Sequence, residues 1–148
     1  MKAEEVYADP SALARLYIHQ AGSREMAAWR AKVRGALAVT HHGRTEIINA
    51  ICRAAFLGQF DSVGMTEALA DLASDFASGH LWQADILWRA ALNRAAELSE
   101  RHTPALGTRS LDVLHVRTMP AAWLRTRSAN LPGVGFRAGA ARVLGCFW

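Results

Sequence analysis

Apolar residues near the amino terminus form two short strand-like runs, and a helical pattern follows each of them. Residues 4–8 form the first run and residues 36–40 the second. Asp9-Pro10-Ser11 directly follows the first run. Proline favours the first helical turn and aspartate or serine caps it, so this tripeptide predicts a helix start. The chain therefore begins as a strand, a helical connection and a second strand.

Apolar residues recur at helical spacing in several later stretches, which predicts a succession of amphipathic helices. The predicted helices span residues 23–35, 42–58, 65–77 and 84–99. His80-Leu81-Trp82 is interpreted as a connector or a short strand. Thr103-Pro104 predicts a break, and Ser110–Val116 predicts the start of one more helix.

Short strands separated by helices favour an α/β fold with a parallel sheet. Too few strands precede residue 112 for a complete sheet. Either the remaining chain supplies further strands or the sheet is short.

Composition is that of a single globular domain, with 148 residues and 51% apolar side chains. No apolar run approaches the length of about 18 residues that a membrane helix needs. The acidic start of the chain is unlike a secretory signal, so the expected compartment is the cytoplasm. Cys52 and Cys146 are too few for a disulfide scaffold, and Cys52 is interpreted as a small buried side chain on an apolar helix.

Charge is distributed unevenly along the chain. The formal net charge is +4, which by itself suggests binding to nucleic acid. Residues 1–112 hold thirteen acidic and twelve basic residues, whereas residues 113–148 hold five arginines and no acid. The end of the chain is also rich in proline and glycine and has no sustained period, so we expect residues 117–148 to form a divergent basic tail without regular structure.

Three acidic residues stand where an α/β sheet places functional groups. Asp9 follows the first predicted strand, Glu46 lies early in the helix after the second, and Asp112 lies in an apolar helix start. Carboxylates that converge repel one another unless a cation holds them, and oxygen ligands suit Mg²⁺ or Mn²⁺. The alternative is that each acid only caps or favours a helix start. His41-His42 is interpreted as part of a loop or cap, because adjacent residues do not share a helix face.

Short segments around these acids form an ordered set. They read Tyr7-Ala8-Asp9-Pro10-Ser11-Ala12-Leu13, Thr45-Glu46-Ile47-Ile48-Asn49-Ala50 and Arg109-Ser110-Leu111-Asp112-Val113-Leu114-His115. In order and separation they resemble the acidic motifs of PIN-domain ribonucleases, and within that family the VapC-type toxins of bacterial toxin–antitoxin pairs. The resemblance covers residues 4 to about 116, so we expect a PIN-like domain over residues 1–116.

The resemblance implies a three-layer α/β/α fold and Mg²⁺- or Mn²⁺-dependent endonucleolytic cleavage of RNA. It implies that Asp9, Glu46 and Asp112 are catalytic metal ligands and that the Ser11 hydroxyl positions water or phosphate nearby. Thr108 and Arg109 are weaker candidates for the same site. The implied partners are an RNA substrate and a cognate antitoxin protein, with a homodimer left open.

The sequence departs from the family pattern after His115-Val116. The family usually continues with a helix and a strand that offers a further acid, but no Asp or Glu follows Asp112 here. This change favours a shift of reading frame over a divergent but native tail. It also leaves open a second function, in which a catalytically degenerate PIN-domain protein only binds a partner such as an antitoxin.

Overall fold

The computed structural model describes residues 6–111, 113 and 114. Asp112, the domain boundary expected after residue 116 and the basic tail lie outside the described residues, so the expectations for them stay predictions. The chain forms two compact units, residues 1–84 and residues 85–148, and each is described by itself.

The first unit is built on a short parallel sheet. Its strands lie in the order β1-β2-β3, and β2 pairs in parallel with both neighbours. Tyr7 pairs with Ala38, and Ala38 pairs with Trp82. The bounds are β1 Val6–Tyr7, β2 Leu37–Thr40 and β3 Leu81–Ala84.

Helices connect these strands where the apolar pattern predicts them. The first connection ends with a glycine in the left-handed region, Gly22, that leads into the second of its helices. In the second connection, Thr40 and Asp61 cap the helices by accepting from Gly43 N and Gly64 N. The bounds are α1 Pro10–Leu13, the 3₁₀ helix η1 Ala14–Leu16, α2 Ser23–Lys32, α3 His41–Phe56 and α4 Ser62–Ala77.

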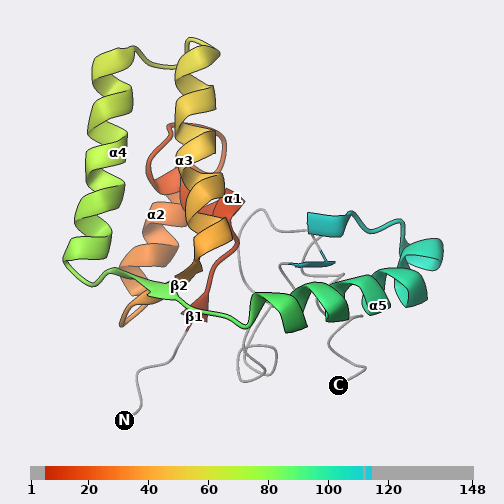
Figure 1. The fold of residues 1–148 in the computed structure, drawn as a ribbon. Coiled ribbons are helices and arrows are strands. Elements are labelled where there is room, and N and C mark those ends of the chain that lie inside the picture. Colours follow the sequence, from red (N-terminus) through yellow and green to blue (C-terminus); the bar gives the residue numbers. More distant parts are fainter. Residues whose placement is uncertain (1–5, 112, 115–148) are drawn as a thin grey trace. The chain divides into compact units, whose positions relative to one another are not determined.

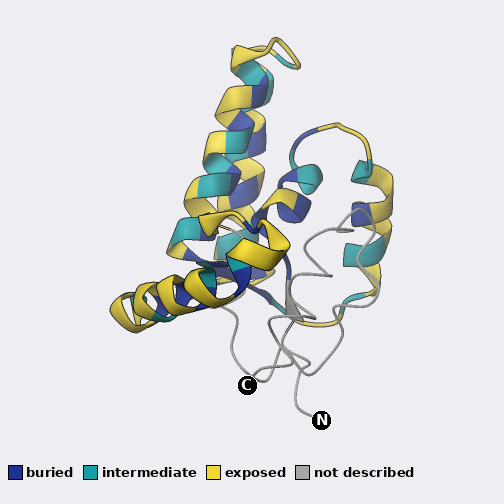
Figure 2. Cartoon of the chain, turned by 90° about the vertical axis from the view of Figure 1, so that its right-hand side faces the viewer, coloured by how far each residue is buried: buried dark blue, intermediate teal, exposed yellow. Residues whose placement is uncertain are grey.

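All of these helices lie on the same side of the sheet (Figure 1). Parallel strands in consecutive order, joined by right-handed crossovers, place both connections on one face. Figure 2 shows the buried positions that the helices contribute to the core. The core includes Leu13, Met26, Leu37, Val39, Ile47, Ile51, Leu72 and Leu81. The α/β expectation with a short parallel sheet is therefore confirmed, while the further layer of a PIN-like arrangement is not found in the first unit.

One side chain on α3 differs from the sequence interpretation. Cys52 is exposed rather than buried. The buried stripe of α3 contains Ile47, Ile51 and Ala54, and Cys52 lies beside that stripe rather than on it.

The second unit contains the long helix α5, Trp88–Leu106. The predicted break at Thr103-Pro104 is wrong, because Pro104 lies inside the last turn of α5. Proline lacks an N–H but disturbs little so near a helix end, and Gly107 N still donates to Thr103 O at 2.8 Å. Ser110, Leu111, Val113 and Leu114 are helical, as predicted. No helix in the described ranges is both long and apolar enough to cross a membrane.

Candidate functional site

Asp9 is held at the carboxyl end of β1 as the cap of α1. Its Oδ1 accepts hydrogen bonds from Ser11 N at 2.9 Å and from the Ser11 hydroxyl at 2.5 Å. Only 7% of Asp9 is exposed. The capping role is thus present, and it fixes the carboxylate of Asp9 at the end of the strand. Ser11, predicted to lie beside the site, is bonded directly to the candidate metal ligand.

Glu46 lies in the second turn of α3, which begins directly after β2. Its Oε1 is 3.7 Å from Nε2 of His42, one turn earlier on the same helix. The two side chains are 31% and 30% exposed, respectively. His42 is therefore a helical neighbour of Glu46, which corrects its interpretation as a loop or cap residue. Their spacing of four residues was the sequence signal that could have identified this pair.

The beginnings of α1 and α3 pack closely against each other. A Cβ atom placed on Gly43 would be only 3.0 Å from Cγ of Pro10. Since β1 and β2 are paired and parallel, their carboxyl ends lie at the same edge of the sheet. Asp9 and the first turns of α3 therefore share this edge, which we call the carboxyl edge. Asp112, the third predicted member of the site, lies outside the described residues.

Thr108, the weaker candidate described in full, belongs to the end of the second unit. It is 6% exposed, and its hydroxyl lies 2.7 Å from that of Thr103. This pairing of two hydroxyl groups closes the turn after α5. The backbone carbonyl of Arg109 accepts from Val113 N at 3.1 Å in the helix that follows. Both residues thus have local structural roles.

Metal binding at the carboxyl edge is supported by the chemistry of its side chains but not by a closed set of ligands. Among residues 6–111, 113 and 114, no three His, Cys, Asp or Glu side chains gather as a group that could hold a metal. Asp9 and Glu46 offer carboxylate oxygens, the donors that Mg²⁺ and Mn²⁺ prefer. These donors fit such an ion as part of a set that needs a further ligand.

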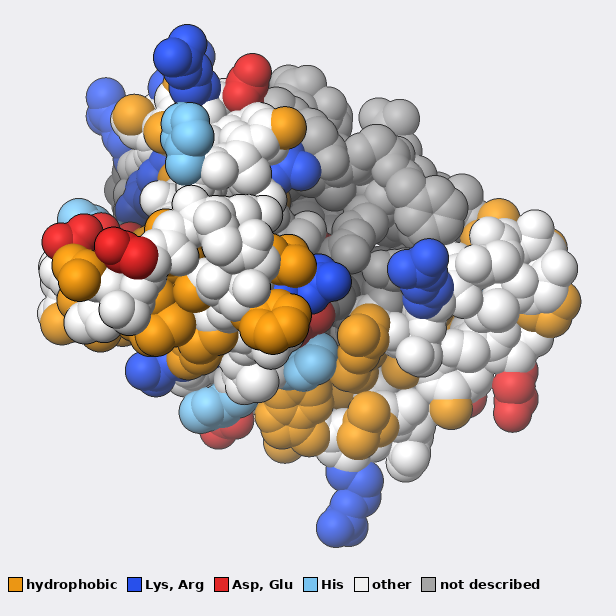
Figure 3. Space-filling view, turned by 90° about the horizontal axis from the view of Figure 1, so that it is seen from above, with side chains coloured by type: hydrophobic (Ala, Val, Ile, Leu, Met, Phe, Trp, Pro, Cys, Tyr) orange, Lys and Arg blue, Asp and Glu red, His pale blue; other side chains and the backbone are white. Residues whose placement is uncertain are grey.

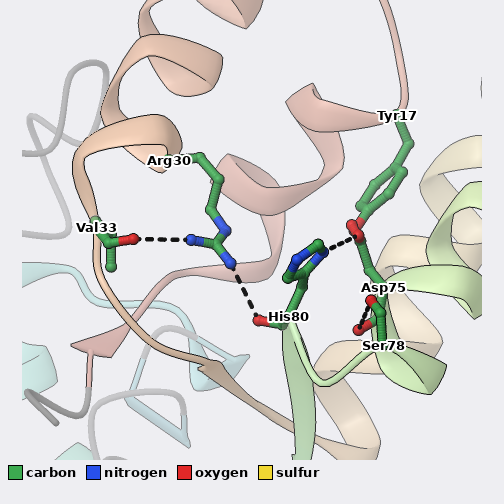
Figure 4. Close-up of polar contacts among 6 residues, drawn as sticks. All are labelled: Tyr17, Arg30, Val33, Asp75, Ser78 and His80. Carbon is green, nitrogen blue, oxygen red and sulfur yellow. Dashed lines mark hydrogen bonds and ion pairs between the residues drawn. The ribbon is translucent and has the colours of Figure 1, made fainter.

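A second polar cluster lies at the opposite edge of the same sheet (Figure 4). The Tyr17 hydroxyl donates to Oδ2 of Asp75 at 2.6 Å, and Nδ1 of His80 is 3.1 Å from Oδ1 of Asp75. Arg30 donates to the carbonyls of Val33 and His80 at 3.1 and 3.4 Å. Burial, and then the hydrogen bond to the Asp75 carboxylate, raise the pKa of Tyr17 well above its ordinary value of 10.0.

This amino-edge cluster joins segments that are far apart in the sequence. It borders an open hollow of about 540 Å³ whose lining also includes Asp71 and Ser74. The carbonyl of His80 additionally accepts from Leu37 N at 2.9 Å, so the cluster connects the end of α2 with the starts of β2 and β3. Its hydrogen bonds account for a structural role. No sequence signal indicates that Tyr17 and Asp75 meet, because they belong to different helical connections.

Comparison with family models, curated proteins and solved structures gives no match to this chain. The resemblance to PIN-domain ribonucleases thus depends on the three acidic motifs and their order. Of these motifs, the structure describes the acidic residues of the first two, Asp9 and Glu46.

Proposed function

We propose that the chain is a metal-dependent endoribonuclease of the PIN-domain kind, which acts as the toxin of a toxin–antitoxin pair in the cytoplasm. The observation that carries the proposal is the placement of Asp9 and Glu46. Asp9 ends β1, and Glu46 lies in the second turn of the helix that follows the adjacent strand β2. Ligand sites of open α/β sheets form at this carboxyl edge.

In this proposal, Asp9, Glu46 and Asp112 hold a Mg²⁺ or Mn²⁺ ion. When bound, such an ion supplies a Lewis acid for phosphodiester hydrolysis and lowers the pKa of water. Ser11 orients the Asp9 carboxylate through its hydroxyl and its backbone N–H. His42 lies beside Glu46, where an imidazole restricts the rotamers that the carboxylate can adopt. The tight contact between Pro10 and Gly43 fixes the separation of the two helix starts.

A second candidate function is binding without catalysis. The sequence favours it at one point, because no Asp or Glu follows Asp112 and the further acid of the family pattern is therefore missing. A protein of this kind would keep the helical connections and bind an antitoxin while cleaving no RNA.

RNA cleavage by the purified full-length chain distinguishes the two functions. We expect cleavage of single-stranded RNA in Mg²⁺ or Mn²⁺ that chelator abolishes. Asp9→Asn and Glu46→Gln should each lower the rate at least about a hundredfold, since an amide is a much weaker ligand than a carboxylate. Glu25→Gln is the matched control, because Glu25 is an exposed acid on α2.

The pattern of results decides between the proposals. Loss in both carboxyl-edge variants with an unchanged Glu25→Gln variant supports the nuclease. Cleavage that persists in Asp9→Asn and in chelator contradicts it. A folded wild-type chain with no cleavage in either metal favours the binding function.

A further inference from the structure

Apolar side chains are exposed where α3 turns into α4. Phe56 is 88% exposed, Leu57 55% and Val63 62%, and the partly buried Phe60 lies between them in the sequence. We call these four residues the hairpin end. Figure 3 looks onto this end of the hairpin, where apolar side chains reach the surface. Exposed apolar groups gathered in this way commonly mark an interaction surface.

The two helices behind the hairpin end carry charges of opposite sign. α3 holds Arg44 and Arg53 against a single acid, Glu46, whereas α4 holds acids and no Lys or Arg. Arg53 and Glu67 are both exposed, and neither forms an ion pair within the part of the chain that the structure describes. The acids of α4 are Glu67, Asp71 and Asp75.

We propose that the hairpin end is a self-association surface that binds the hairpin end of a second copy of this chain. A twofold axis parallel to the hairpin brings α3 of each copy against α4 of the other. The arginine-bearing helix then faces the acidic helix twice, and the exposed apolar residues meet between them. A hairpin with one basic and one acidic helix complements itself in this arrangement, which favours a second copy over a partner with a single sign of charge.

This proposal is independent of the nuclease activity. The carboxyl edge lies where α3 begins, whereas the hairpin end lies where α3 finishes. Self-association can therefore be present or absent whichever function the chain has.

The first test is the mass of the full-length chain in solution, measured by sedimentation over a range of concentrations. We expect a reversible dimer whose dissociation constant rises at least about tenfold in Phe56→Glu and in Leu57→Glu. Leu92→Glu is the matched control, because Leu92 is 54% exposed on α5, away from the hairpin end. A monomer at every attainable concentration overturns the proposal, as does a dimer that Phe56→Glu leaves unchanged.

The second test uses the charges. Arg53→Glu should weaken the dimer, and adding Glu67→Arg in the same chain should restore it, because both sides of the interface are then reversed. If the double variant is as weak as the sum of the single effects, the facing of α3 against α4 is refuted. Circular dichroism on each variant confirms that these exposed substitutions leave the helices intact.

Cys52 supplies an independent readout. It is exposed and lies one turn before Phe56 on α3. In a Cys146→Ser background, a short thiol cross-linker should join two copies through Cys52, and Phe56→Glu should abolish that product. Equal cross-linking in both proteins would indicate random collision and would contradict the proposed surface.

Discussion

Tyr17 gives the most specific expectation for a single residue. Its hydroxyl donates to Asp75, and burial raises its pKa above the ordinary value of 10.0. As pH rises through 10, the unfolded chain therefore releases this proton while the folded chain retains it, so the folded state becomes less stable. Tyr17→Phe should cost about 1–2 kcal/mol at neutral pH, because a hydrogen bond to a charged group is lost. It should also reduce the loss of stability above pH 10, a change that urea unfolding can measure.

Asp9 and Tyr17 show which residue roles a sequence can reveal. The capping role of Asp9 follows from its immediate neighbours, and the structure confirms it through Ser11. Tyr17 was predicted only as part of an apolar helix face, because its partner Asp75 comes from a distant helix. Local hydrogen bonds are encoded within a few residues, whereas this cluster depends on how the helical connections pack.

At the scale of elements, Gly43 sets how closely α3 approaches α1. Alanine normally stabilises a helix by about 1 kcal/mol relative to glycine. At Gly43, however, the new Cβ would be 3.0 Å from Pro10 and 3.3 Å from the Thr40 hydroxyl. Crowding of this kind costs about 1–3 kcal/mol, so Gly43→Ala should lower the free energy of unfolding by about 1 kcal/mol.

The matched substitution for Gly43→Ala is Asn49→Ala on the exposed side of the same helix. Because nothing crowds an exposed position, Asn49→Ala should stabilise the protein by about 0.5 kcal/mol. Opposite signs for the two alanine variants, measured by urea unfolding, confirm the close contact of α1 with α3. A stabilising Gly43→Ala would show that the helix starts can move apart freely.

Helices were predicted better than the remaining elements. The strongly periodic α3 and α4 begin within a few residues of their predicted starts. The strand β3 is too short to have a period of its own and becomes a strand by pairing with β2. Pro104 was misjudged because its effect depends on its position in α5, and the sequence does not mark where that helix ends.

At the scale of the whole molecule, the order of strands explains what the first unit contains. Consecutive parallel strands with right-handed connections collect their helices on one face. The sequence predicted this α/β class, because strands and helices alternate from the beginning of the chain. It could not supply the register or the close contact of Pro10 with Gly43, which depend on side-chain packing across the two connections.

Direct binding of Mn²⁺ to the full-length chain, measured by calorimetry without RNA, tests the central claim that Asp9 and Glu46 hold a divalent cation. We expect one ion per chain, with affinity at least about tenfold weaker in Asp9→Asn and in Glu46→Gln, since each removes a charged oxygen ligand. The Glu25→Gln variant should bind as the wild type does. Equal Mn²⁺ affinity in the wild type and both carboxyl-edge variants would contradict the account.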